Sequence, residues 1–283
     1  MLELIESHAS FGGTQRIYKH ESKAIGLPMR FSVFMPKEAA QKKAPALFYL
    51  AGLTCTEETF PIKAGAQRFA AQYGIALIAP DTSPRGAGIA GESDAWDFGV
   101  GAGFYVDATQ MPWSKPYRMY SYVRDELRET VVNELPVDGS RLGIFGHSMG
   151  GHGALVLALR NPEIYRSVSA FAPIAAPTRC PWGEKAFSGY LGGDREAWKQ
   201  YDASELVGKA TRKFAERILV DQGLADQFLA QQLNPDVFEA ACKAAGQPLT
   251  LRRHEGYDHG YFFIATFVED HVRHHARILN GVH

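Results

Sequence analysis

Ser148 lies at the centre of a Gly146-x-Ser148-x-Gly150 motif, the pattern in this chain that most directly suggests chemistry. An apolar run from Leu142 to Phe145 precedes the motif, and an apolar segment from Ala154 to Leu159 follows it. These flanks predict a strand, a sharp turn and a helix, with glycines where strand and helix come too close for a Cβ atom. Such a turn would expose the Ser148 hydroxyl above the sheet. We interpret it as the nucleophile elbow of a serine hydrolase rather than as a glycine-rich turn with a chance serine.

A serine hydroxyl becomes a good nucleophile only when a base takes its proton, and His259 is our candidate for that base. His259 lies between the last predicted strand and the last predicted helix, on a loop expected at the same edge of the sheet as the elbow. His254 belongs to the preceding strand end and is expected to be structural. The helical spacing of His271, His274 and His275 could suggest a metal site, but no pattern of metal-binding carboxylates accompanies them. We expect these three on a solvated helix face.

The base needs an acid that holds its tautomer, and in this type of fold the acid lies between the serine and the histidine in the chain. Asp226 follows the predicted strand at 218–223 and is our first choice. Asp221 lies inside the strand exit, where it is expected to support the loop, and is the reserve. Asp258 is less suitable because neighbouring side chains on an extended loop diverge, and it is adjacent to His259.

Two backbone N–H groups should stabilise the oxyanion that forms during acyl transfer. One is expected to be the amide of Met149, directly after the nucleophile. The other should come from the loop after an early central strand, and Leu53 in Gly52-Leu53 is the candidate. Only the backbone of Leu53 is needed, so its side chain is free to pack in the core.

These residues require a mostly parallel sheet with helices on both faces, which the pattern of the chain predicts. The predicted strands are 29–33 (half-buried and antiparallel), 46–50, 75–79, 142–145, 168–171, 218–223 and 249–251. The predicted helices are 64–73, 120–135, 154–159, 238–245 and 261–279. We expect an ordered loop with many glycines and aromatic residues at about 82–116 and an irregular insertion at 174–212. The fold class predicted is therefore the α/β-hydrolase fold, in a single domain over residues 1–283.

Length and composition fit one globular α/β domain, with 283 residues, 46% of them hydrophobic and 22% charged. A net charge of −1 gives no bias toward nucleic acid or anionic membranes. The N-terminus lacks a basic signal-peptide region, and no apolar run approaches the length of a membrane span. The three cysteines, Cys55, Cys180 and Cys242, lack metal-ligand spacing. They predict free thiols in a reducing cytoplasm.

Several longer motifs carry a resemblance to a known family. They are Gly52-Leu53-Thr54-Cys55-Thr56, Trp96-Asp97-Phe98-Gly99, residues 101–109, residues 146–154 and Tyr257-Asp258-His259. With these motifs, the chain closely resembles the S-formylglutathione hydrolases of the esterase D family over nearly its whole length. Many hydrolases share the elbow, but the Leu-Thr-Cys loop and the glycine-rich aromatic segment are far more specific.

The resemblance implies hydrolysis of the thioester S-formylglutathione to glutathione and formate, a step of formaldehyde detoxification, through an acyl-enzyme on Ser148. It implies a triad of Ser148, Asp226 and His259, which agrees with the choice made from the residues alone. It also implies a homodimer. For Cys55 it suggests a thiol close to the active site that modulates access or redox sensitivity. A small buried residue is an equally good interpretation of that cysteine.

Three other functions are alternatives for a chain with this fold. The first is a general short-chain carboxylesterase with incidental thioesterase activity. An interaction protein that lost catalysis would lack a triad member or fill the oxyanion loop, and the sequence shows neither. An acyltransferase would differ only in the acceptor that reaches the acyl-enzyme. We expect no cofactor, no metal, and no nucleic-acid or membrane partner. Lys63, Arg85 and Arg118 are candidates to meet a substrate carboxylate.

Overall fold

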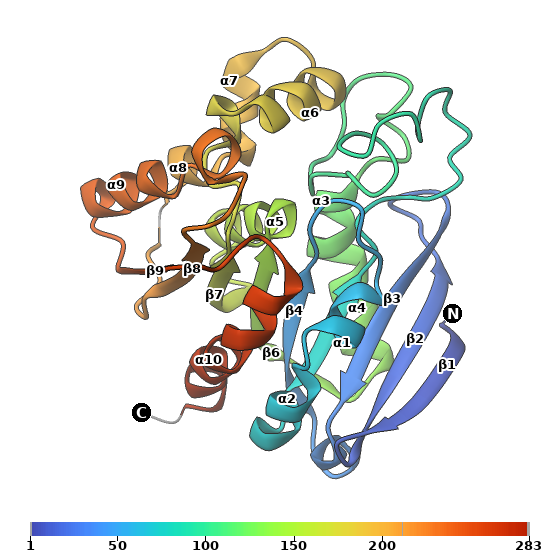
Figure 1. The fold of residues 1–283 in the computed structure, drawn as a ribbon. Helices are drawn as coiled ribbons and strands as arrows, with labels where there is room; N and C mark the ends of the chain where they lie inside the picture. The colour runs from blue at the N-terminus through green and yellow to red at the C-terminus, as the bar shows by residue number, and fades with distance from the viewer. Residues whose placement is uncertain (1, 211, 282–283) are drawn as a thin grey trace.

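One nine-stranded sheet organises the chain in the computed structural model, which describes residues 2–210 and 212–281 (Figure 1). The strands lie in the order β1-β2-β3-β5-β4-β6-β7-β8-β9. The pairs β1–β2, β2–β3 and β3–β5 are antiparallel, and every pair from β5 to β9 is parallel. The predicted single-domain, mostly parallel α/β sheet is confirmed. The strands are β1 (Glu3–Ser10), β2 (Gly13–Glu21), β3 (Pro28–Met35), β4 (Ala44–Leu50), β5 (Ala76–Pro80), β6 (Val137–His147), β7 (Tyr165–Phe171), β8 (Ile218–Gly223) and β9 (Leu249–His254).

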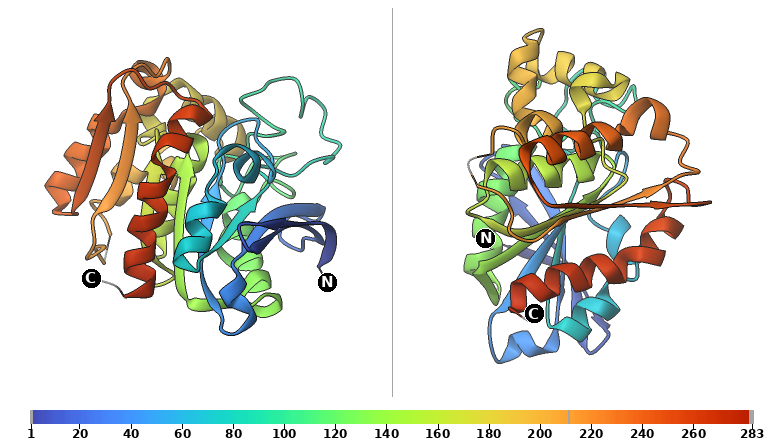
Figure 2. Two further views of the ribbon diagram at one scale, coloured as in Figure 1. Left: turned by 60° about the horizontal axis from the view of Figure 1, so that its bottom comes forward. Right: turned by 90° about the vertical axis from the view of Figure 1, so that its left-hand side faces the viewer.

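Helices cover both faces of the sheet, which Figure 2 shows edge-on in its right-hand view. α2 and α10 contact each other and pack on one face, whereas α4 and α5 pack on the other. The helices are α1 (Thr59–Lys63), α2 (Gln67–Tyr73), α3 (Met119–Ser121), α4 (Arg128–Glu134), α5 (Met149–Arg160), α6 (Pro181–Leu191), α7 (Arg195–Trp198), α8 (Ala203–Leu206), α9 (Pro235–Ala245) and α10 (Tyr261–Asn280). Two π-helical segments, Tyr122–Leu127 and Leu229–Leu233, and 3₁₀ turns at Lys37–Ala40, Pro177–Arg179 and Lys199–Tyr201 complete the described elements.

All seven predicted strands are present, and β4, which was predicted from an apolar run, is buried along its whole length. Parallel strands covered on both faces are apolar throughout, which is why these runs were legible in the sequence. β1 and β2 were not predicted. Nearly every residue of β1 is exposed, so this edge strand has no alternation of apolar and polar residues to indicate it.

The two excursions from the sheet differ from each other in kind. Residues 82–116 form an ordered loop, as expected, and this loop packs against α6, where Phe98 stacks on Tyr190 with ring centres 4.5 Å apart (Figure 1). The expectation of an irregular insertion at 174–212 was wrong, because this segment contains α6, α7 and α8. Pro181 begins α6, and the side chains of Asp194 and Asp202 cap α7 and α8 by accepting backbone N–H groups.

Candidate active site

Ser148 forms the predicted sharp turn between β6 and α5. Its backbone has φ 57° and ψ −119°, a conformation that residues with a side chain rarely adopt. The turn is held because the Ser148 N–H donates to the Phe171 carbonyl at 3.0 Å, and the Ser148 carbonyl accepts from His152 N–H at 2.9 Å. A Cβ atom on Gly146 would lie 2.2 Å from the Gly150 carbonyl oxygen. Strand and helix therefore meet as closely as the motif predicts, and the strain is concentrated at the serine.

His259 and Asp226 meet although they come from different loops. Nδ1 of His259 lies 2.6 Å from Oδ2 of Asp226, whose other oxygen accepts the Phe228 N–H at 2.8 Å. Gln222 donates a further hydrogen bond to Oδ2 at 3.2 Å. A carboxylate at Nδ1 favours the tautomer with the proton on that nitrogen, which leaves Nε2 as a free base. This is the arrangement that a serine nucleophile requires.

Ser148 and His259 line the same small pocket, of about 130 Å³. The other lining residues are Gly52, Leu53, Cys55, Trp96, His147, Trp182, Phe228 and Tyr261. The sequence analysis did not predict His147, Phe228 or Tyr261 at the site. His147 is adjacent to Ser148 and Tyr261 lies two residues from His259, so their positions in the chain were a usable signal. Phe228 likewise lies two residues after Asp226, whereas Trp182 reaches the pocket from α6 through tertiary packing.

The two proposed oxyanion donors are the backbone amides of Met149 and Leu53. The amide of Met149 is the first of α5, so it has no partner within its helix. The Leu53 amide lies on the loop after β4, which is fixed by hydrogen bonds from Thr54 N–H to Gly101 O and from Cys55 N–H to Gly52 O, at 2.9 and 3.3 Å. Within residues 2–210 and 212–281, neither amide donates a hydrogen bond to a backbone carbonyl of a turn, loop or cap. Two preorganised N–H groups beside the nucleophile can stabilise developing negative charge.

The reserve acid, Asp221, has a different environment. It is buried, and its two oxygens accept from Arg252 at 2.6 and 2.5 Å. Although burial opposes it, hydrogen bonds from His271 and Arg252 hold the pKa of Asp221 below its usual range. Asp258 accepts the N–H of Gly260 at 2.9 Å and so shapes its own loop. Of the three carboxylates, the structure brings Asp226 to the imidazole of His259.

The expectation of a solvated face for the histidines of α10 was wrong. His271 and His275 are fully buried, and they share the hydroxyl of Ser169 at 2.8 Å each. Burial lowers the pKa values of both, so they are neutral near pH 7. Their partners lie on β7, far away in sequence, and the pattern of α10 alone could not reveal them. No group of three or more metal-ligating side chains is present in the part of the chain that the structure describes.

Cys55 lies at the pocket with its side chain partly exposed, and it is a free cysteine. Burial raises the pKa of its thiol, and the nearby hydroxyls of Thr59 and Tyr261 oppose this effect. The thiol is therefore mostly protonated near pH 7 and is a weak nucleophile. Cys180 and Cys242 are free and buried.

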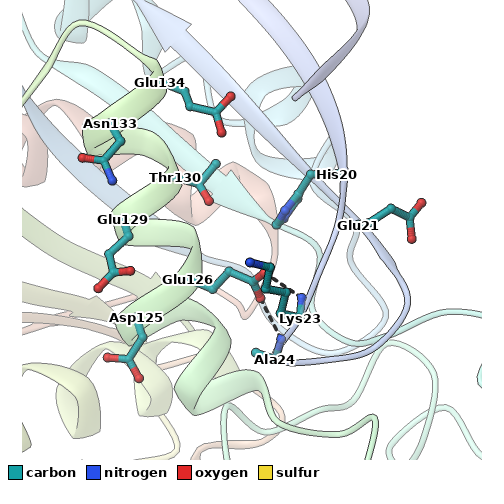
Figure 3. A pocket seen from close by; sticks show the side chains of 10 residues that line it. All are labelled: His20, Glu21, Lys23, Ala24, Asp125, Glu126, Glu129, Thr130, Asn133 and Glu134. Carbon is teal, nitrogen blue, oxygen red and sulfur yellow. Dashed lines mark hydrogen bonds between the residues drawn. The ribbon is translucent and has the colours of Figure 1, made fainter. Parts of the chain in front are cut away.

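A larger hollow, of about 470 Å³, lies apart from these residues between β2 and α4 (Figure 3). Five carboxylates line it, from Glu21, Asp125, Glu126, Glu129 and Glu134. The carboxylate of Glu126 accepts the main-chain N–H groups of Lys23 and Ala24 at 2.7 and 3.0 Å, so it ties the loop after β2 to the neighbouring helical segment. None of the predicted site residues lines this hollow.

The fold and the site together define the class of protein to which this chain belongs. The Esterase family model, described as "Putative esterase", matches residues 22–274. A mostly parallel sheet with a serine at a strained strand-to-helix turn, in one pocket with a histidine held by a carboxylate, is the arrangement of α/β-hydrolase-fold serine hydrolases. The chain is an enzyme of this class, and the predicted α/β-hydrolase fold is confirmed.

Comparison with individual proteins gives the family. The chain is 56% identical to the S-formylglutathione hydrolase of Mus musculus, over 99% of each chain. It is 54% identical to the S-formylglutathione hydrolase of Arabidopsis thaliana, over 98% of each chain. The solved structure of the S-formylglutathione hydrolase from Agrobacterium tumefaciens superimposes with a TM-score of 0.95 and 47% identity, over 98% of this chain and 99% of that one. The chain belongs to the S-formylglutathione hydrolase family.

No helix in residues 2–210 and 212–281 is both long and apolar enough to cross a membrane.

Proposed function

We propose that this chain hydrolyses S-formylglutathione to glutathione and formate, with Ser148 as the nucleophile, His259 as the base and Asp226 as the residue that orients the base. The observation that carries the proposal is the 2.6 Å contact between His259 and Asp226 beside a small pocket that Ser148 also lines. The names and full-length identity of the relatives support the substrate.

The reaction begins when Nε2 of His259 takes the proton of Ser148 as Oγ attacks the formyl carbonyl. The oxyanion that forms accepts hydrogen bonds from the amides of Leu53 and Met149. The C–S bond then breaks, the thiol of glutathione leaves with a proton, and the formyl group stays on Ser148 as an ester. Water, deprotonated by His259, attacks this ester, and formate leaves with regeneration of the serine hydroxyl.

The small pocket suits a small acyl group. A formyl group carries only hydrogen on its carbonyl, so a cavity of about 130 Å³ beside Ser148 holds it together with part of the thiol. Trp96, Trp182 and Phe228 line this cavity and leave little room for a long acyl chain. The rest of glutathione must lie outside, where its binding can orient the carbonyl.

The test compares kcat/KM for S-formylglutathione, S-acetylglutathione, short p-nitrophenyl esters and a formyl thioester of a small thiol. We expect S-formylglutathione to have much the highest value, and longer acyl chains to lower it progressively. The small formyl thioester keeps the reacting bond and removes the peptide. If it is hydrolysed as efficiently as S-formylglutathione, glutathione recognition is absent and the enzyme is a general short-chain carboxylesterase.

We also infer a cytoplasmic homodimer in which residues 1–283 form one domain. The family resemblance supports the dimer, and the three free cysteines support a reducing compartment. Light scattering of the purified protein measures the mass of the assembly, and a mass of one chain would contradict the dimer. Fractionation of the source cells tests the compartment.

A further inference from the structure

The aromatic side chains around the pocket form a continuous arc. The ring of His259 lies in the middle, and the rings of Trp96 and Tyr261 are its two ends. The distances between successive ring centres are 5.6 Å for Trp96–Trp182, 4.7 Å for Trp182–Phe228, 5.0 Å for Phe228–His259, 4.5 Å for His259–His147 and 6.2 Å for His147–Tyr261. Lys63 ends α1 beyond one end of this arc and Lys185 lies on α6 beyond the other, and Figure 1 shows these two helices apart from each other.

Lys63 lies beyond the Tyr261 end. Its ammonium nitrogen is 5.8 Å from the centre of the Tyr261 ring, and the side chain is exposed. No carboxylate lies within ion-pair distance of Lys63 in the part of the chain that the structure describes. Arg85 differs, because its guanidinium is bound to Asp81 at 2.6 Å and to the carbonyl of Cys55. Unlike Arg85, Lys63 is thus a cation at this end that is available to a ligand.

An ion pair lies beyond the Trp96 end. Asp97 directly follows Trp96, and Lys185 lies one helical turn after Trp182 on α6. The ammonium group of Lys185 pairs with the carboxylate of Asp97. The Lys185 side chain is 46% exposed and that of Asp97 15%, so both can be reached from solvent.

We propose that these two places bind the two charged ends of the glutathione leaving group: Lys63 binds the glycine carboxylate, and the Asp97–Lys185 pair binds the amino-acid end of the γ-glutamyl residue. This inference rests on the proposed function. The thiol lies in the middle of glutathione, so a formyl group at Ser148 sends one arm of the peptide to each side.

Charge complementarity determines which arm goes where. The glycine arm ends in a carboxylate alone, which matches the unpaired ammonium of Lys63. The γ-glutamyl arm ends in a carboxylate and an ammonium, which match Lys185 and Asp97 respectively. In the reverse orientation the ammonium of the substrate would approach Lys63, and like charges repel.

Exposed ion contacts of this kind are weak and screened by salt. They can still orient the thioester, because binding energy from remote parts of a substrate lowers the barrier at the reacting centre. We therefore expect each contact to contribute about tenfold to kcat/KM, the size of one hydrogen bond to a charged group.

The experiment changes enzyme and substrate together. Wild type and Lys63→Gln are assayed with S-formylglutathione and with its glycine amide, which lacks only the terminal negative charge. We expect Lys63→Gln to lower kcat/KM about tenfold for S-formylglutathione and no more than about twofold for the amide, which has no charge to lose. Equal losses on the two substrates would show that Lys63 does not act on this carboxylate and would overturn the assignment.

A second experiment tests the γ-glutamyl site. It uses Asp97→Asn and a glutaryl analogue of the substrate, in which hydrogen replaces the ammonium group of the γ-glutamyl residue. Asp97→Asn should lower kcat/KM about tenfold for S-formylglutathione but leave the analogue within about twofold. If the variant instead loses activity equally on both substrates, the ion pair only holds the 82–116 loop against α6, and this half of the proposal is wrong.

Lys243→Gln on α9 is the matched control, because it removes the same charge from an exposed position that does not line the pocket. Lys243→Gln should leave kcat/KM unchanged for S-formylglutathione and for its glycine amide. A failure of the proposed function is visible in the wild type alone, as equal kcat/KM for S-formylglutathione and the small formyl thioester. If the wild type prefers S-formylglutathione and the variants show no dependence on the substrate charge, only the charge assignment fails.

Discussion

Nδ1 of His259 lies 2.6 Å from Oδ2 of Asp226, whereas Asp221, five residues earlier, binds Arg252. Both carboxylates belong to one segment, yet they have separate partners because Asp221 lies inside β8 and Asp226 lies beyond its end. Arg252 comes from the neighbouring strand β9, and His259 comes from the loop that follows β9. The register of β8 and β9 therefore decides which aspartate meets the imidazole.

Asparagine substitutions distinguish the role of Asp226 from that of Asp221. Asp226→Asn should lower kcat roughly 10⁴-fold, as loss of the carboxylate does in other serine triads, with little change in stability. Asp221→Asn removes the charge that Arg252 and His271 contact, although Arg252 keeps the carboxylate of Asp270 at 2.7 Å. The loss of these charged hydrogen bonds should cost roughly 2 kcal/mol of stability, while the folded protein keeps most of its kcat. Steady-state kinetics and urea unfolding of both variants measure these effects. A larger loss of kcat in Asp221→Asn would mean that Asp226 is the wrong acid.

Ser148→Ala and His259→Ala should each nearly abolish turnover, by roughly 10⁶-fold in kcat. Their losses should not add in the double variant, because the base has no task without the nucleophile. Single-turnover assays of the three variants measure the coupling. Additive losses, or a Ser148→Ala protein with most of its activity, would contradict the assignment.

The sequence predicted the parts of this molecule that depend on local patterns. The seven strands and the elbow could be predicted because each is a short segment with a definite pattern, apolar or alternating for the strands and glycine-spaced for the elbow. Asp226 and His259 were predicted from their order in the chain and from their places on loops after predicted strands, since the loops at one edge of a parallel sheet lie close together. The contact between these two side chains then follows from the fold.

Other features depend on partners that are distant in the chain. His271 and His275 were misplaced because the Ser169 hydroxyl that satisfies them lies on β7. α6 was missed although Trp182, Ala186 and Tyr190 lie at helical spacing and are buried, because nearby glycines and Pro181 suggested irregular structure. The role of Trp182 as a pocket wall is a tertiary contact that no local pattern contains.

Gly52→Ala tests the oxyanion loop. A Cβ atom at Gly52 would lie 3.2 Å from both Nδ1 of His147 and Cβ of Ser148, which is a tight contact, so we expect a shift of a few tenths of an ångström between Ser148 and the loop that carries the Leu53 amide. Because loss of one oxyanion donor costs about 10²–10³ in kcat, we expect a loss of about 10- to 100-fold here, with a small change in KM. Gly193→Ala is the control, because its Cβ meets nothing within 4 Å. Unchanged kcat in Gly52→Ala would argue against Leu53 as a donor.

A thiol reagent should inactivate the enzyme by modifying Cys55, because any group added to this thiol occupies the pocket beside Ser148. The reaction should be slow near neutral pH and faster at higher pH, since burial raises the pKa of the thiol. Cys55→Ser should remove the sensitivity and keep kcat within about tenfold, and Cys242→Ser should leave the sensitivity intact. An inactive but folded Cys55→Ser protein would show that the thiol takes a larger part in the reaction.

Acid should destabilise the fold through its buried histidines. Burial lowers the pKa values of His152 and His274 to about 4, from an ordinary value of 6.5. Below pH 6.5 the unfolded chain therefore binds protons that the folded protein does not accept until about pH 4. Stability is greatest above pH 6.5 and falls as the pH decreases through this window, by at most about 3 kcal/mol for each histidine.

His274→Gln isolates one of these contributions, because Nε2 of His274 is buried without a hydrogen-bond partner and the substitution removes the titrating group. Urea unfolding at pH 7 and pH 5 should show a smaller loss of stability on acidification in this variant than in the wild type. His8→Gln is the control, since His8 is 64% exposed and its removal should leave the difference between the two pH values unchanged. If His274→Gln and the wild type lose the same free energy between pH 7 and pH 5, the buried imidazole of His274 does not oppose protonation, and the acid sensitivity must come from other groups.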